Sequence, residues 1–188
     1  MVKRSISKKP KLKKCKVCKN EFKPWESLER LCSPRCAIEF VRLEKDNKQT
    51  KENKKALKEL NDNDRGIQTE KAQTIFNRYI RLRDVNLPCV SCGRHHAGQY
   101  HAGHYRSRGA YPELRFDERN CHKQCSACNN RLSGNITNYR INLVRKIGIA
   151  EVERLEGPNP PKKYTIDDLK ELQKMYKDKI RQMEKDNV

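Results

Sequence analysis

Residues 89–134 read CVSCGRHHAGQYHAGHYRSRGAYPELRFDERNCHKQCSACNNRLSG and hold most of the chain's motifs. The stretch begins with the pair Cys89 and Cys92, nears its end with the pair Cys125 and Cys128, and holds every histidine of the chain. In a reducing compartment, such short spacings are typical of zinc sites rather than disulfides. Two thiolates of one pair reach the same ion from a tight turn, and two pairs complete a tetrahedral shell. The stretch therefore predicts a structural zinc site, with redox-active pairs as the alternative.

A second set of paired cysteines lies near the N-terminus: Cys15, Cys18, Cys32 and Cys36. Ser33 and Pro34, inside the last pair, suit the cap and the first position of a helix. We therefore expect a basic arm and a four-cysteine zinc finger over residues 1–40. Each zinc is expected to decide whether its small module folds. Cys121 is left over, and we expect it to be a buried free thiol.

Composition points to small modules that meet a polyanion. The 188 residues carry a formal net charge of +19, and hydrophobic residues make up only 35% of the chain. One large core is excluded, because an average soluble domain is nearer half apolar. No stretch approaches the ~20 apolar residues of a transmembrane helix, and the basic start lacks the apolar centre of a secretory signal. Positive charge gathers in residues 1–23 and 81–146, which favours nucleic acid over anionic lipid.

The remaining chain divides into three further segments. Residues 41–68 are expected to form a charged helical connector, with partial disorder as the alternative. Residues 69–150 form the central module, introduced by a helix with apolar residues at helical spacing. Residues 151–188 hold a proline-rich turn and a C-terminal helix, whose start carries the capping box of Thr165 and Asp168. The apolar stripe of that helix packs by default on its own chain, with pairing between two subunits as the alternative.

The histidine-rich part of the central module has the groups for phosphodiester hydrolysis. Such hydrolysis needs a nucleophilic water, charge stabilisation at phosphorus and help for the leaving oxygen. Few acids are present, so we expect one metal ion and a histidine base rather than a carboxylate-rich two-metal site. A neutral imidazole takes the proton from water near pH 7, and a polar group must hold it in orientation.

Six cations of this segment are expected to contact DNA: Arg106, Arg108, Arg115, Arg119, Lys123 and Arg131. Arginine binds phosphate with two parallel hydrogen bonds. The alternative for Arg115 and Arg119 is pairing with the nearby acids Glu113 and Glu118.

These motifs resemble a known family. A CxxC pair, a histidine on a β-hairpin and an asparagine directly after the second CxxC pair resemble the His-Asn-His nucleases, in the variant of the endonuclease VII type. More closely, the chain is similar to the lambdoid phage NinG family, also called the Rap recombination endonucleases. The likeness rests on CKVC and LCSPRCA near the N-terminus and on LPCVSCG, AGHYRSRGAYPELRFDERN and HKQCSACNNRLSGN. It is weak through 40–68 and strong through 70–145.

The resemblance implies a fold and a set of site residues. The fold would be α+β, with small zinc-stabilised modules: the N-terminal four-cysteine zinc finger, long helices and a ββα-metal (His-Me finger) nuclease core. His104 would be the general base, Asn120 would orient it or stiffen the hairpin, and Asn129 would contribute to the catalytic metal site. His101 stands where the family usually has aspartate, and we expect it to bind the same metal. The implied cofactors are two structural Zn²⁺ and one catalytic Mg²⁺ or Mn²⁺; imidazole in place of carboxylate favours the softer ion.

The implied activity is that of an endonuclease of phage recombination. It would hydrolyse branched DNA, such as Holliday junctions and D-loops, in the cytoplasm of a bacterial host cell. A homodimer suited to symmetric cuts and recombination proteins as partners are implied in the same way. A non-catalytic zinc-finger adaptor that binds DNA is the first alternative, which the histidine at 101 leaves open. An RNA-binding zinc protein is the second, and competition between DNA and RNA at matched salt would separate it.

Overall fold

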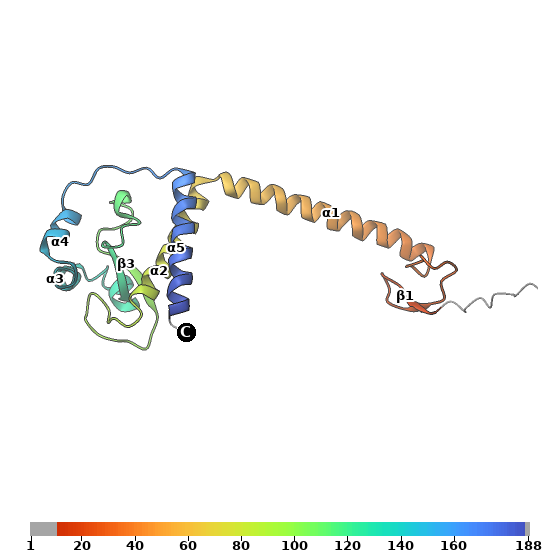
Figure 1. Ribbon diagram of the computed structural model, residues 1–188, viewed down its shortest axis with the longest axis horizontal. Coiled ribbons are helices and arrows are strands. Elements are labelled where there is room, and N and C mark those ends of the chain that lie inside the picture. Colours follow the sequence, from red (N-terminus) through yellow and green to blue (C-terminus); the bar gives the residue numbers. More distant parts are fainter. Residues whose placement is uncertain (1–10, 187–188) are drawn as a thin grey trace, which may run out of the picture. The chain divides into compact units, whose positions relative to one another are not determined.

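The computed structural model describes residues 11–186, which form two compact units that divide between Leu60 and Asn61 (Figure 1). Residues 1–10, the first part of the expected basic arm, lie outside the described residues. Within the described range, no helix is long and apolar enough to cross a membrane.

The first unit begins with a small hairpin and continues into a long helix. Strands β1 (Lys13–Lys14) and β2 (Glu21–Phe22) pair antiparallel. Helix α1 (Pro34–Asn63) begins as expected, because the hydroxyl of Ser33 accepts a hydrogen bond from the backbone N–H of Cys36 at 3.2 Å. This cap sets the start of the helix inside the last cysteine pair.

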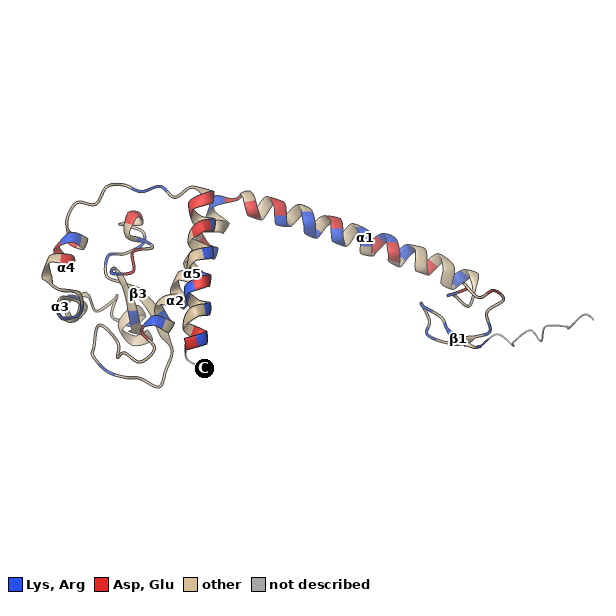
Figure 2. Cartoon of the chain, viewed as in Figure 1, with Lys and Arg blue, Asp and Glu red and all other residues tan. Residues whose placement is uncertain are grey.

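The expected helical connector is part of α1. Most of this helix is exposed, and basic and acidic residues are interspersed along it (Figure 2). Lys48 lies 4.0 Å from Glu52, and Lys55 lies 4.0 Å from Glu59, both one turn apart. Such pairs stabilise a solvated helix modestly. The expected limit at residue 40 falls inside α1, because neither glycine nor proline interrupts the chain there.

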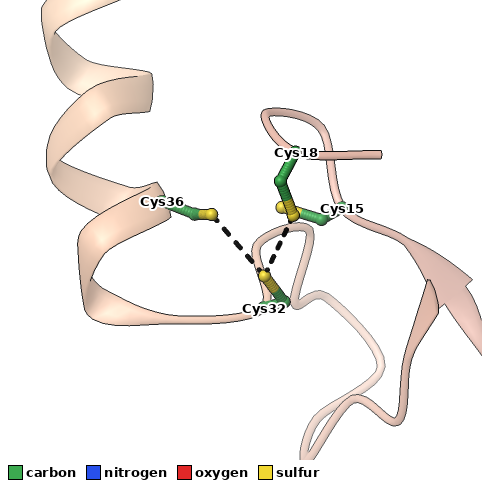
Figure 3. A group of neighbouring side chains, drawn as sticks. All are labelled: Cys15, Cys18, Cys32 and Cys36. Atoms are coloured by element: carbon green, nitrogen blue, oxygen red, sulfur yellow. Dashed lines mark hydrogen bonds between the residues drawn. The ribbon is translucent and has the colours of Figure 1, made fainter. Parts of the chain in front are cut away.

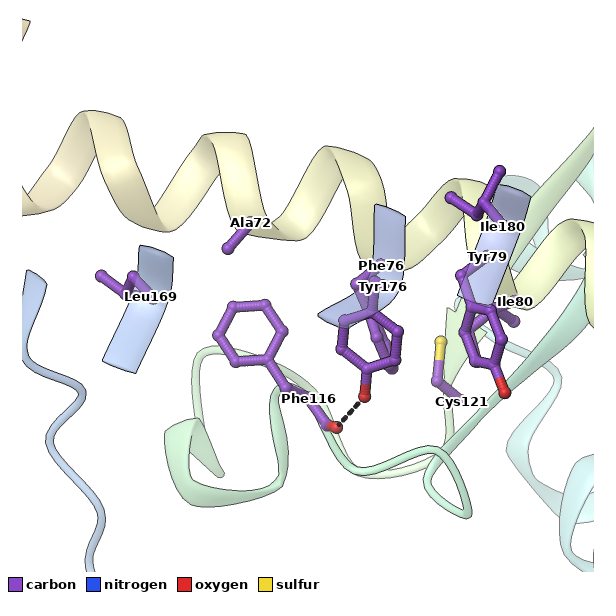
Figure 4. Close-up of a cluster of buried hydrophobic side chains, with 9 residues drawn as sticks. All are labelled: Ala72, Phe76, Tyr79, Ile80, Phe116, Cys121, Leu169, Tyr176 and Ile180. Carbon is purple, nitrogen blue, oxygen red and sulfur yellow. Dashed lines mark hydrogen bonds between the residues drawn. The ribbon is translucent and has the colours of Figure 1, made fainter. Parts of the chain in front are cut away.

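Two helices that are distant in the sequence form the main core of the second unit. Helix α2 (Arg65–Arg83) packs against helix α5 (Ile166–Asp186). The capping box at the start of α5 is confirmed: the N–H of Thr165 donates to the Asp168 carboxylate at 2.8 Å, and the N–H of Asp168 donates to the Thr165 hydroxyl at 3.1 Å. The C-terminal helix thus packs on its own chain, as the default expectation had it. The buried side chains of this core are Ala72, Phe76, Tyr79, Ile80, Phe116, Cys121, Leu169, Tyr176 and Ile180 (Figure 4).

A β-hairpin lies against this core. Strands β3 (Tyr100–His104) and β4 (Cys121–Cys125) pair antiparallel, with His104 opposite Cys121. Their connection contains the short 3-10 helix η1 (Pro112–Leu114). Every residue of β4 is buried. The side chain of Gln124 lies so close over Gly103 that a Cβ there would stand 2.0 Å from Gln124 Oε1, so any larger residue at 103 requires Gln124 to move.

The element after the hairpin differs from the ββα expectation. A five-residue π-helical turn, η2 (Ala127–Arg131), follows β4, and the regular helix α3 (Ile136–Ile147) begins later. Ser133, Gly134 and Asn135 all have positive φ, at 46°, 88° and 46°. A right-handed helix cannot pass through left-handed residues, so the chain breaks between η2 and α3.

A second core joins the end of the hairpin to two short helices. Helix α4 (Ile149–Glu156) packs against α3. The expected limit at residue 150 falls inside α4, within the second unit. The core side chains are Val90, Tyr105, Leu114, Tyr139, Leu143, Val152 and Leu155. The Tyr139 hydroxyl donates to the Gly103 carbonyl at 2.9 Å, which ties α3 to β3.

Candidate functional site

Four sulfur atoms converge in the first unit, as Figure 3 shows. Cys15 and Cys18 come from the turn after β1, and Cys32 and Cys36 come from the start of α1. All four Sγ atoms lie within 4.8 Å of one another, and the cysteines form no disulfide. The expected grouping is confirmed, and four thiolates at this separation are the donor set of a structural zinc site.

The second cysteine cluster belongs to the second unit. Cys89, Cys92, Cys125 and Cys128 also have all Sγ atoms within 4.8 Å of one another. The N–H of Cys125 donates to Cys89 Sγ at 3.3 Å, and the Asn135 amide donates to Cys128 Sγ at 3.6 Å. Hydrogen bonds of this kind orient the ligands of a metal. This donor set also fits Zn²⁺, which would hold the loop after α2 against the end of the hairpin.

A polar cavity of about 360 Å³ lies beside the hairpin. Three of the predicted site residues line it together: His101 and His104 from β3, and Asn129 from η2. Arg108, one of the predicted phosphate-binding cations, lines it as well. Other side chains at the cavity are Asn77, Arg81 and Ser107.

Asn77 and Arg81 are site residues that sequence reasoning missed. They lie four residues apart on α2 and therefore on one face of that helix. That spacing is visible in the sequence, but the direction of the face depends on how α2 packs against α5.

His104 is held as a neutral imidazole. Its Nε2 lies 2.9 Å from the Arg115 carbonyl, so Nε2 carries the hydrogen and Nδ1 is the proton acceptor. Nδ1 lies 3.5 Å from the sulfur of Cys121. That cysteine is buried and forms no disulfide, so the expected buried free thiol is confirmed. Burial lowers the pKa of His104 to about 4; the hydrogen bond to the Arg115 carbonyl opposes this effect, and the charge of Arg108 adds to it. The imidazole is thus unprotonated at pH 7.

Asn120 stiffens the loop between the two strands. It is fully buried, and its Oδ1 accepts a hydrogen bond from the N–H of Arg106 at 2.8 Å. Its amide donates to the carbonyls of Arg106 and Leu114 at 2.9 and 3.1 Å. Of the two predicted roles, these contacts match stiffening of the hairpin.

One ring nitrogen of His101 has no hydrogen-bond partner among the described residues. This atom, Nε2, is also buried. Buried polar atoms usually have a partner, so a free nitrogen at a cavity suits a metal ligand. No carboxylate is among the described residues that line this cavity.

Comparison with known proteins decides the family. The family described as Bacteriophage Lambda NinG protein matches residues 7–186. The chain belongs to the NinG family. No solved structure matches the chain, so the resemblance to His-Asn-His nucleases and to endonuclease VII stays a prediction.

The relatives in the NinG family match over most of their length. Protein ninG of Escherichia phage 933W is 34% identical over 192 residues, which cover 93% of this chain and 95% of that protein. Protein ninG of Escherichia phage lambda is 34% identical over 194 residues, with the same coverage. Protein ninG of Salmonella phage P22 is 34% identical over 188 residues, covering 88% of this chain and 92% of that protein.

The arginines of this NinG-family chain have varied surroundings. The guanidinium of Arg106 lies 4.0 Å from the ring centre of Tyr111. Arg115 lies 3.8 Å from Glu70, and Arg119 lies 3.0 Å from Glu151. Both therefore pair with acids, but not with Glu113 or Glu118 as the alternative had it, because helices distant in the sequence supply the carboxylates. Arg108 and Arg131 are exposed.

Lys123 does not lie on the surface of this NinG-family chain. Its residue is only 6% exposed, its ammonium donates to the Val85 carbonyl at 2.7 Å, and the same group lies 4.5 Å from the ring centre of Tyr100. The expected contact between Lys123 and DNA is therefore corrected: the fully buried strand β4 turns this lysine inward.

Sequence reasoning also missed a buried charged cluster beside β4. The Asp84 carboxylate pairs with Arg83 at 2.9 Å and with Lys146 at 3.2 Å, and it accepts the N–H of Lys123 at 3.0 Å. Burial alone would raise the pKa of Asp84, but hydrogen bonds from His122 and Arg83 hold it well below its usual range. The cluster joins the end of α2 to β4 and α3.

Proposed function

We propose that this NinG-family chain is a metal-dependent endonuclease that hydrolyses phosphodiester bonds in branched DNA. The observation that carries the proposal is the cavity that gathers His101, His104 and Asn129 beside Arg81 and Arg108. A neutral histidine, an imidazole nitrogen without a partner and two arginines around one cavity are groups that phosphodiester hydrolysis requires.

His104 is the general base in this proposal. The Arg115 carbonyl fixes the hydrogen on Nε2, so Nδ1 is the atom that takes a proton from water. The neighbour of Nδ1 is the thiol of Cys121 at 3.5 Å, a weak donor, and the proposal requires a water from the cavity to reach Nδ1 in its place. Asn120 acts through the loop: its three hydrogen bonds hold the segment that carries the Arg115 carbonyl.

His101 and Asn129 are the residues that would hold the catalytic divalent ion. When bound, such an ion stabilises charge on the phosphate and on the leaving oxygen. An imidazole and an amide oxygen, with no carboxylate among the described lining residues, suit Mn²⁺ better than Mg²⁺. The substitution His101→Asp supplies a hard anionic oxygen and should shift the metal preference towards Mg²⁺.

Positive charge supports DNA as the substrate. Arg81 and Arg108 are exposed residues that also line the cavity, so their guanidinium groups are accessible to a backbone phosphate. Four further parts of the proposal rest on the family resemblance alone. They are the preference for branches, action on symmetric junctions as a homodimer, partnership with recombination proteins, and the cytoplasm of a bacterial host as the place of action.

The experiment compares cleavage and binding in matched variants. Nicking of supercoiled plasmid is measured with Mn²⁺ or Mg²⁺ for wild type, His104→Ala and His95→Ala, where His95 is an exposed histidine outside the cavity. The proposal expects metal-dependent nicking in wild type and His95→Ala, and none in His104→Ala, which still binds DNA. Nicking by His104→Ala at the wild-type rate contradicts it. Binding by all three proteins with no cleavage under either metal supports the zinc-finger adaptor instead.

A further inference from the structure

Arg115 lines a second cavity and also contacts His104 of the histidine cavity. The second cavity has a volume of about 650 Å³, and the side chain of Arg115 lines it. The carbonyl of the same residue accepts the hydrogen bond from His104 Nε2 at 2.9 Å. One residue therefore contributes its side chain to the second cavity and its backbone to the orientation of the proposed base.

The lining of the second cavity is strongly positive. It contains four cations from three separate segments of the chain: Arg65 at the start of α2, Arg115 after η1, and Lys162 and Lys163 before α5. The carboxylate at this cavity is Glu70, which lies 3.8 Å from Arg115 and whose side chain is 71% exposed. With four cations and one carboxylate among the described lining residues, the cavity keeps an excess of positive charge.

Two hydroxyl-bearing residues, Thr69 and Tyr164, also line the cavity. Their hydroxyls donate to backbone carbonyls, that of Thr69 to Arg65 at 2.7 Å and that of Tyr164 to Glu113 at 3.4 Å. The ammonium of Lys162 lies 4.7 Å from the ring centre of Tyr164. The contact between Tyr164 and Glu113 connects the segment before α5 with the loop that carries Arg115.

We propose that the second cavity binds a backbone phosphate of the same DNA whose cleaved phosphate occupies the histidine cavity. The inference rests on the proposed function, because it takes the histidine cavity as the place of the cleaved phosphate. Each strand of DNA carries one phosphate per about 3.4 Å of helix axis. A strand that enters beside His104 therefore brings further phosphates near Arg115, whose carbonyl contacts His104. The second cavity contributes affinity and register, and it takes no part in the chemistry.

The test measures the salt dependence of DNA binding in two matched variants. Lys162→Gln/Lys163→Gln removes two cations from the second cavity, and Lys170→Gln/Lys174→Gln removes two exposed cations of α5 that line neither cavity. All four lysines are exposed, so both variants are expected to fold. Binding of a labelled duplex and a labelled four-way junction is measured by fluorescence anisotropy across a KCl series, without added divalent metal.

The proposal expects a different salt slope in one variant only. Each neutralised phosphate contributes about 0.9 to the slope of log binding constant against log salt, so the loss of this one phosphate lowers its magnitude by about 0.9 in Lys162→Gln/Lys163→Gln. The α5 variant keeps the wild-type slope. Equal slopes in the two variants overturn the proposal.

These measurements distinguish a failure of the phosphate-site proposal from a failure of the nuclease proposal. Nicking by His104→Ala at the wild-type rate would refute the nuclease proposal, yet a lowered slope would still assign a DNA phosphate to the second cavity. Unchanged slopes together with loss of nicking in His104→Ala would refute the second cavity alone.

Discussion

Replacement of the buried Asn120 by alanine tests how the loop between β3 and β4 is held. The side chain makes three hydrogen bonds to backbone groups, at 2.8, 2.9 and 3.1 Å. In Asn120→Ala, the N–H and carbonyl of Arg106 and the carbonyl of Leu114 lose these partners. The Leu114 carbonyl is in a buried bond, whereas the two Arg106 bonds are part-buried.

The loss in stability follows from these contacts. A buried group left without a partner costs about 1–3 kcal/mol, and a hydrogen bond that water can replace costs about 0.5–1.5 kcal/mol. One contact of the first kind and two of the second give a loss of about 4 kcal/mol in the free energy of unfolding. That is a large part of the roughly 5–15 kcal/mol typical of a domain. The matched control Asn130→Ala changes an exposed asparagine and should cost less than about 0.5 kcal/mol.

The second unit carries its own spectroscopic reporters for this assay, because all seven tyrosines lie there. Trp25 of the first unit is 92% exposed, so amide hydrogen exchange of peptides from residues 11–60 follows that unit instead of fluorescence. Urea unfolding of the zinc-saturated chain is measured by tyrosine circular dichroism and by this exchange. Asn120→Ala should lower the tyrosine midpoint and leave exchange in the first unit unchanged. A loss below about 1 kcal/mol, or an equal shift in both signals, would refute the assigned role of Asn120.

Three further predictions concern zinc, the hairpin and pH. Cys125→Ser should lose one zinc and the tyrosine circular dichroism of a folded second unit, because a structural zinc supplies folding energy. Cys32→Ser should lose one zinc and keep that tyrosine signal. Metal analysis that finds two zinc ions in Cys125→Ser contradicts this. Gly103→Ala should cost about 1–3 kcal/mol by overpacking, since its Cβ would meet Gln124 Oε1 at 2.0 Å; urea midpoints equal to those of wild type would show that Gln124 moves freely. Burial lowers the pKa of His104 to about 4 from 6.5, so the neutral imidazole contributes stability above pH 6.5 that is lost as pH falls towards about 4. The cleavage rate should therefore rise with pH through about pH 4. An inflection of the rate near pH 6.5 that persists under saturating metal contradicts this.

Local signals were predicted well from the sequence. Both cysteine groupings follow from spacing, because a short spacing restricts which thiolates can reach one ion. The caps at Ser33 and at Thr165 with Asp168 follow from side-chain chemistry that acts within one helical turn.

Features that depend on tertiary packing were missed. The sequence predicts Lys123 as a surface cation, because one face of a strand is usually exposed. Strand β4 is buried on both faces, so its lysine is buried as well. Arg81 lines the histidine cavity because α2 packs on α5, a helix far away in the sequence. The break before α3 depends on positive φ at Ser133 and Asn135, which non-glycine residues rarely adopt.

We propose that His104 drives metal-dependent cleavage of branched DNA. Single-turnover cleavage of a labelled four-way junction tests this beside a linear duplex of matched sequence, with Mn²⁺, Mg²⁺ or no metal, for wild type, His104→Ala and His95→Ala. We expect metal-dependent cuts near the branch in wild type and His95→Ala, with none in His104→Ala. Tight junction binding with no cuts under any metal, or cuts that survive in His104→Ala, would contradict it.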